Sequence, residues 1–116
     1  MPKIEVKTSL KTKENTVFYD VIALKKEGSL HYLENEFNVK VDITENCVKM
    51  LRKNSEYGLD FHFEIGNSKC LMNLNDGTTL DIPINTIKLE IEDSKVNIIY
   101  LLNEDEFNYL IDIKEV

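Results

Sequence analysis

Charged side chains occur on the apolar face of two predicted strands. Tyr32 and Glu34 follow Leu30 at intervals of two residues, and Arg52 follows Met50 in the same way. Successive side chains of a strand point to opposite faces, so this spacing turns Glu34 and Arg52 toward the interior or its rim. A buried charge is tolerated only when it is paired and hydrogen-bonded. We therefore expect Glu34 and Arg52 to meet.

Two roles are open for this pair. With a hydroxyl group from Tyr32 or Tyr100 nearby, it would form a polar anchor at the base of a ligand cavity. Tyr32, Glu34, Arg52 and Tyr100 are therefore the candidate ligand-binding residues of the interior. The alternative is an ion pair at the strand ends, with a structural role alone.

The other reactive side chains do not form a known catalytic or metal-binding pattern. Cys47 and Cys70 are not part of a CxxC pair, and His31 and His62 do not complete a metal-ligand spacing. The glycines are isolated, and there is no GxSxG elbow. Cys70 alternates with apolar residues and is expected in the core. The sequence predicts no catalytic residue, no metal site and no cofactor, and an enzyme is the least favoured class.

The elements that position these side chains are strands, because apolar and polar residues alternate along most of the chain. Short polar breaks separate the runs and leave no room for crossover helices, which predicts an antiparallel meander. One break, Asn75-Asp76-Gly77, contains the Asp-Gly pair that a type I′ hairpin turn prefers. The predicted strands cover roughly residues 2–12, 16–26, 29–36, 37–44, 47–53, 57–66, 69–75, 78–92, 95–103 and 107–115.

The segment 78–92 predicts that the sheet bends. Its apolar residues lie at even positions through Ile84 and at odd positions from Ile87, and Pro83 lies just before the change. A period of two cannot shift by one residue without a bulge, a bend or a corner. The alternative is two strands joined at Asn85-Thr86. A bent strand favours a barrel, so the predicted fold is a single all-β domain over residues 1–116, a meander β-barrel of about eight to ten strands.

Residues 104–112 could form either a last strand or a short helix. Asn103 could cap a helix, with Glu106 as its capping-box partner. Phe107, Tyr109 and Ile111 also alternate as in a strand. We favour the strand, because the sheet needs a final partner for its edge.

Composition limits the partners. Hydrophobic residues make up 42% of the 116 residues and charged residues 30%, as in globular proteins. A net charge of -7 argues against nucleic acid and anionic membrane surfaces. No apolar run approaches the roughly 18 residues that cross a bilayer, so no membrane insertion is expected. Residues 1–5 lack an apolar signal core, which predicts a cytoplasmic location.

Five segments carry a resemblance to a known family, and along the chain they are Gly28–Glu34, Cys47–Arg52, Leu59–Gly66, Asp76-Gly77 with Leu80–Thr86, and Val96–Leu102. In this order they resemble the YwiB-like family, small bacterial β-barrel proteins of unknown function that are grouped with the lipocalin-like calycins. The resemblance implies a closed calycin-like barrel and carries over no activity and no site residue. The chain has no tryptophan, so it lacks the Gly-x-Trp motif of true lipocalins.

The sequence thus predicts a non-enzymatic module that binds a small apolar or amphipathic ligand inside a barrel. Small barrels either hold one ligand or fill with side chains. The alternative is therefore a protein-interaction or structural module with a filled barrel and no ligand. Either module would be a monomer or a homodimer.

Overall fold

A computed structural model describes residues 3–114, all of which belong to one antiparallel sheet or its connecting turns. This range excludes residue 2 of the first predicted strand and residue 115 of the last one. It also excludes both ends of the predicted domain, residues 1–116. The described residues contain no helix, and therefore none that could cross a membrane. The strands are β1 (Lys3–Lys11), β2 (Thr16–Lys26), β3 (Ser29–Glu34), β4 (Phe37–Ile43), β5 (Val48–Lys53), β6 (Tyr57–Phe63), β7 (Lys69–Leu74), β8 (Thr79–Asp81), β9 (Ile84–Ile91), β10 (Lys95–Leu102) and β11 (Asp105–Lys114).

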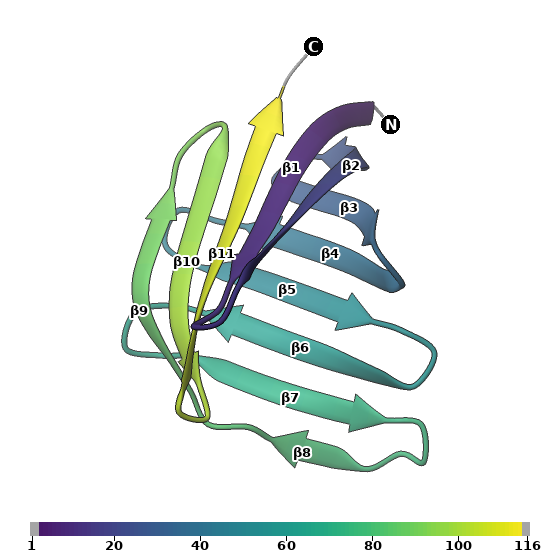
Figure 1. Ribbon diagram of the computed structural model, residues 1–116, viewed down its shortest axis with the longest axis vertical. Helices are drawn as coiled ribbons and strands as arrows, with labels where there is room; N and C mark the ends of the chain where they lie inside the picture. The colour runs from purple at the N-terminus through teal and green to yellow at the C-terminus, as the bar shows by residue number, and fades with distance from the viewer. Residues whose placement is uncertain (1–2, 115–116) are drawn as a thin grey trace.

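The sheet is a meander that curls into a half-barrel (Figure 1). Its strand order is β8-β7-β6-β5-β4-β3-β2-β1-β11-β10-β9, so every sequential pair from β1 to β8 is adjacent, and β1 also pairs with β11. The predicted all-β meander is confirmed, with eleven strands instead of eight to ten. The edge strands β8 and β9 do not pair in the described range, so the sheet is more open than the closed barrel that the resemblance implied.

The predicted irregularity in residues 78–92 is present, and the segment forms two strands instead of one bent strand. The segment divides into β8 and β9 at Ile82-Pro83, where proline has no N–H group to donate to a ladder. In the pairing of β9 with β10, Lys88 lies opposite Ile99 but Thr86 lies opposite Tyr100, which leaves Ile87 as the extra residue of a bulge. The bulge lies where the apolar phase changes. Ile87 itself is 48% exposed, and the odd-numbered Leu89 and Ile91 continue the partly buried face after it. The alternative joint at Asn85-Thr86 is wrong, because both residues lie within β9.

The C-terminal segment was predicted to be a strand and Asp76-Gly77 to be a type I′ turn. Residues 105–114 form the strand β11, as favoured over a helix, and Asn103 makes the preceding turn with a positive φ of 63°. The predicted type I′ turn at Asp76-Gly77 is wrong, because Gly77 has a positive φ of 88° and Asp76 does not. The amide of Gly77 donates to the carbonyl of Leu74, as part of a longer loop.

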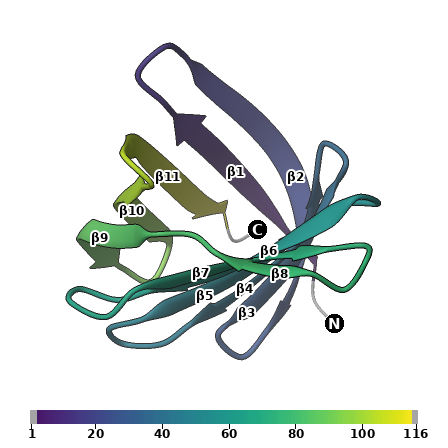
Figure 2. The same ribbon diagram turned by 90° about the horizontal axis from the view of Figure 1, so that it is seen from below.

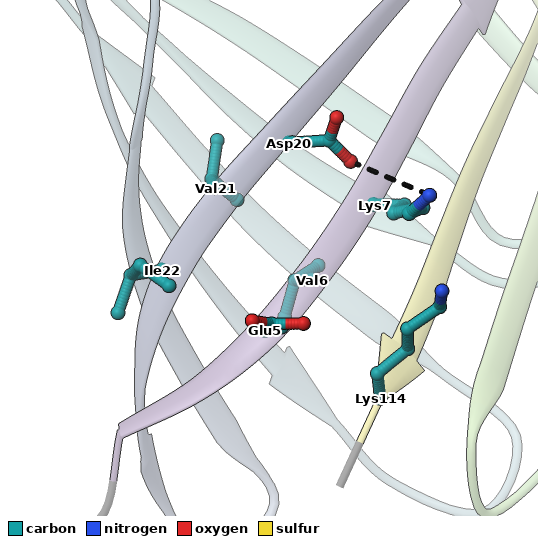
Figure 3. A pocket seen from close by; sticks show the side chains of 7 residues that line it. All are labelled: Glu5, Val6, Lys7, Asp20, Val21, Ile22 and Lys114. Carbon is teal, nitrogen blue, oxygen red and sulfur yellow. Dashed lines mark ion pairs between the residues drawn. The ribbon is translucent and has the colours of Figure 1, made fainter. Parts of the chain in front are cut away.

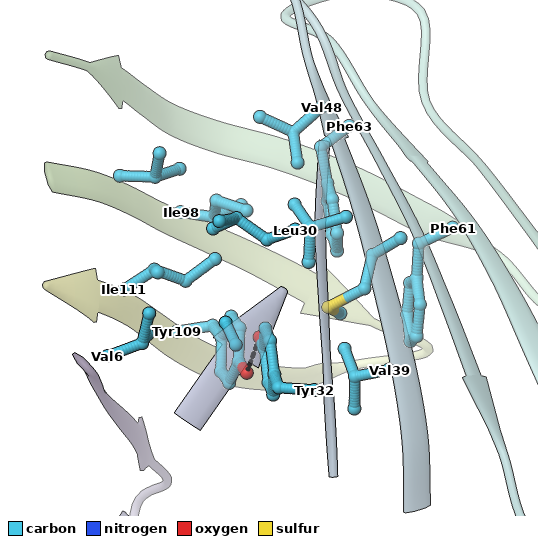
Figure 4. Packing of buried hydrophobic residues seen from close by; sticks show 14 of the residues in the cluster. Val6, Leu30, Tyr32, Val39, Val48, Phe61, Phe63, Ile98, Tyr109 and Ile111 are labelled. Atoms are coloured by element: carbon cyan, nitrogen blue, oxygen red, sulfur yellow. Dashed lines mark hydrogen bonds between the residues drawn. The ribbon is translucent and has the colours of Figure 1, made fainter. Parts of the chain in front are cut away.

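The inward side chains fill the half-barrel (Figure 4). Burial alternates along the central strands as the sequence pattern predicts, and Cys70 is fully buried, as expected. Burial raises the pKa of the Cys70 thiol to about 11, helped by Asp60 and Asp81. The hydrophobic core residues with at most 2% exposure are Val6, Ala23, Leu30, Val39, Val41, Val48, Met50, Phe61, Phe63, Cys70, Val96, Ile98, Tyr109 and Ile111.

One ladder of the sheet is short. β2 pairs with β3 only from Leu24 to Lys26, whereas β1 and β2 pair along their whole length. The β1–β2 hairpin consequently projects away from the rest of the sheet (Figure 2). The β3 residues beyond His31 therefore have no backbone ladder with β2, and Glu34 at the end of β3 takes side-chain partners from β1 and β11 instead.

Candidate functional site

Glu34 and Arg52 meet inside the half-barrel, as the sequence predicts. Glu34 ends β3, Arg52 lies in β5, and β4 runs between them. Arg52 Nη1 donates to Glu34 Oε1 at 2.7 Å. Only 1% of the Glu34 side chain is exposed, against 14% for Arg52. The carboxylate is therefore enclosed, while the Arg52 side chain is partly exposed at the rim of the half-barrel.

The second carboxylate oxygen of Glu34 accepts two hydroxyl groups from the opposite side of the curl. Thr8 Oγ1 of β1 donates at 2.5 Å, and the Tyr109 hydroxyl of β11 donates at 2.6 Å. Because the Tyr109 proton is used in this way, Tyr109 accepts the hydrogen bond from the Tyr32 hydroxyl at 2.7 Å (Figure 4). The chain Tyr32 to Tyr109 to Glu34 thus joins β3 and β11, and each bond polarises the next.

Sequence reasoning missed two members of this network. It expected the hydroxyl group from Tyr32 or Tyr100, but Thr8 and Tyr109 donate to the carboxylate directly. The Tyr100 hydroxyl makes no hydrogen bond within the described range, and its ring stacks on Phe107 with centroids 5.4 Å apart. The sequence did indicate that both side chains point inward, because Thr8 and Tyr109 each occupy an apolar position in the alternating pattern of their strand.

The guanidinium group of Arg52 lies between two aromatic rings. Its Cζ atom is 4.8 Å from the Phe37 ring centroid and 5.8 Å from that of Tyr109, within the range of cation–π attraction. Burial is the largest single influence and opposes the positive charge, but the Glu34 carboxylate together with Tyr109 and Tyr32 outweighs it, so the pKa of Arg52 is raised. The group therefore remains charged at the rim.

The three interior tyrosines are all harder to ionise than tyrosine in water. Burial is the main reason that the pKa values of Tyr32, Tyr100 and Tyr109 are raised, and the nearby Glu34 carboxylate adds to the effect. Their hydroxyl groups therefore stay protonated and remain donors near neutral pH. They are not poised to act as bases.

These shifts predict how stability depends on alkaline pH. Between the unfolded pKa of about 10 and the higher folded values, the unfolded chain holds fewer protons than the folded one, so the free energy of unfolding falls as pH rises above about 10. We expect part of the tyrosinate absorbance to appear only as the far-ultraviolet circular dichroism is lost. Ionisation of all five tyrosines with an intact circular dichroism spectrum would contradict this burial.

The fold has a known counterpart among solved structures. The chain is similar to the crystal structure of ywiB protein from Bacillus subtilis, with a TM-score of 0.64 and 14% sequence identity, over 98% of this chain and 90% of that one. The chain has a YwiB-like fold. No protein-family model matches the sequence, and no curated protein matches it. At this identity the similarity concerns the arrangement of strands.

Five surface hollows of this YwiB-like half-barrel lie away from the four candidate residues. One groove of about 330 Å³ lies along β1 and β2 (Figure 3). Charged side chains dominate its lining, and Lys7 Nζ lies 3.8 Å from Asp20 Oδ1. Tyr32, Glu34, Arg52 and Tyr100 do not line it. The structure thus places these four residues in a packed interior and its rim, and their binding role stays a prediction.

Proposed function

We propose that this half-barrel is a non-enzymatic module that binds a small amphipathic anion at its rim, through Arg52. The observation that carries the proposal is the unused hydrogen-bonding capacity of this side chain. A guanidinium group has five N–H donors, and in the described range that of Arg52 makes one hydrogen bond, to Glu34. Its planar fork suits a carboxylate or a phosphate.

The surroundings of Arg52 support an amphipathic partner. Leu59 lies directly opposite Arg52 in the β5–β6 pairing, and Phe37 packs against the guanidinium group. Both side chains are only partly buried against the core. An anionic head group on Arg52 would therefore place an apolar tail against Leu59 and Phe37. The filled interior leaves the rim as the place for such a ligand.

A second candidate is a protein-interaction or structural module without a small ligand. It is favoured by the interior itself, where side chains occupy the space and the carboxylate of Glu34 already has three donors. In that case the Glu34–Arg52 pair would serve the fold alone. The two candidates differ in whether Arg52 has an anionic partner.

The test compares probes that share a ten-carbon chain and differ in the charge of the head group. We expect decanoate to shift the nuclear magnetic resonance signals of the Arg52 Nε–H group and of Phe37, in a saturable titration. Decanol and decyltrimethylammonium should bind at least about tenfold more weakly than decanoate, because neither offers an anionic acceptor to the guanidinium fork. Arg52→Lys retains a charge beside Glu34 but loses the fork, so it should weaken decanoate binding by about tenfold.

The matched control is Lys49→Gln, which removes a cation from an exposed position of the same strand. It should leave decanoate binding unchanged. Equal binding of decanol and decanoate, or equal loss in the Lys49 and Arg52 variants, would overturn the proposal. A chain that binds no probe and forms a dimer in solution would support the interaction module instead.

A further inference from the structure

Three side chains with metal-binding atoms gather on the outer surface of β5 and β6. Cys47 directly precedes β5, Glu64 directly follows β6, and Val48 pairs with Phe63, so the strand pairing brings Cys47 beside Glu64. His62 lies two residues before Glu64 and so shares its face of the sheet. One ligand atom from each of the three lies within 4.8 Å of the others.

The distances around the imidazole ring are near those of tetrahedral coordination and reach them after small side-chain movements. His62 Nε2 lies 3.7 Å from Cys47 Sγ and 2.9 Å from Glu64 Oε1. Zinc bonds of about 2.3 Å to sulfur and about 2.0–2.2 Å to nitrogen and oxygen place such ligand atoms about 3.3–3.6 Å apart at tetrahedral angles. The sulfur also lies 3.5 Å from Nδ1, so coordination requires the ring to turn about its Cβ–Cγ bond until Nε2 points between the other two atoms.

We propose that Cys47, His62 and Glu64 form a binding site for a divalent transition metal of the zinc class, distinct from the Arg52 rim. Sulfur and nitrogen ligands exclude the calcium and magnesium class, which takes oxygen. A thiolate and a carboxylate together balance the charge of a divalent ion. Binding releases the thiol proton of Cys47 to solvent, and a water molecule completes the fourth position.

A catalytic cysteine is the competing explanation, because a thiol, an imidazole and a carboxylate in this order resemble the nucleophile, base and orienting group of a hydrolase. Burial and the nearby Glu64 carboxylate raise the pKa of the Cys47 thiol, whereas a nucleophilic cysteine requires it to be lowered. Cys47 is also only 9% exposed.

The site is accessible to a metal ion from solvent. The side chains of His62 and Glu64 are 27% and 32% exposed. Lys49 and Lys69 flank His62 on the neighbouring strands, and both are exposed, so their ammonium groups can turn away from an entering cation. Asn67 Nδ2 lies 3.4 Å from Glu64 Oε1 and can help to orient the carboxylate.

The experiment is a titration of the reduced, metal-free chain with Co²⁺, which reports on sulfur ligation by its colour. We expect one equivalent to give a thiolate-to-cobalt charge-transfer band and tetrahedral visible bands, both displaced by Zn²⁺. Cys47→Ser should abolish the charge-transfer band. His62→Ala and Glu64→Gln should each weaken binding by at least about tenfold, since loss of even an outer-shell partner costs that much.

Two variants provide matched controls. Cys70→Ala removes the other thiol, and Asp60→Asn removes an exposed carboxylate two residues before His62; both should keep the cobalt spectrum. In the unmodified chain, Zn²⁺ should shift the ring proton signals of His62 and leave those of His31 in place. Absence of the charge-transfer band, its retention in Cys47→Ser, or unchanged His62 signals would overturn the metal site.

Discussion

Replacing Arg52 with methionine lowers the free energy of unfolding by about 3–5 kcal/mol in our account, because the substitution leaves the Glu34 carboxylate buried without its cationic partner. Glu34 would retain only the hydroxyl donors of Thr8 and Tyr109. Urea denaturation followed by circular dichroism measures the change. The packing of the guanidinium group on Phe37 adds to the loss.

The control for this substitution is Lys49→Met, in the same strand and on the solvent side. Exposed positions of this kind usually change stability by no more than about 0.5 kcal/mol. If the Arg52 variant lost no more than the Lys49 variant, Glu34 would not depend on Arg52, and the ion pair would lie in solvent instead of the interior.

Phe63→Ala is the second substitution with a large expected effect. Phe63 of β6 is fully buried and contacts Tyr100 of β10 on the other wall of the half-barrel, with ring centroids 4.9 Å apart. It also stacks on Phe61 at 5.1 Å. Removing a buried phenylalanine ring costs about 3–5 kcal/mol, including the cavity that remains. Thermal or urea unfolding should show this loss.

Phe18→Ala is the matched control, since Phe18 is 77% exposed on β2. The same chemical change should cost about 0.5 kcal/mol or less at that position. Similar losses at Phe18 and Phe63 would mean that β6 and β10 do not share one core. The half-barrel would then be a flatter sheet than the structure describes.

Alternation was enough to predict the strands and the face of most side chains. It placed Glu34 and Arg52 inward and His62 outward, and the structure agrees on all three. The change of phase before Ile87 correctly indicated an irregularity, but the sequence does not show which residue is the extra one of the bulge, and that residue is the exposed Ile87. The turn at Asp76-Gly77 was misassigned for a related reason. A loop that is one residue longer than the two-residue loop of a type I′ hairpin has a different turn type.

The partners of the site could not be predicted from one strand at a time. Thr8 and Tyr109 reach Glu34 across the curl, past the short β2–β3 ladder, and their distance depends on how tightly the sheet bends. Cys47 and Glu64 become neighbours only once β5 and β6 adopt their register. Phase fixes the face of a side chain, whereas register and curvature determine which side chains meet.

The double-mutant cycle between Glu34 and Arg52 tests the central claim, that these residues form a coupled pair inside the half-barrel. It compares the unfolding free energies of the unmodified chain, Glu34→Leu, Arg52→Met and the double variant. We expect each single variant to lower the free energy of unfolding. The loss in the double variant should be smaller than the sum of the two single losses by about 0.5–3 kcal/mol. Additivity within about 0.3 kcal/mol would contradict the account.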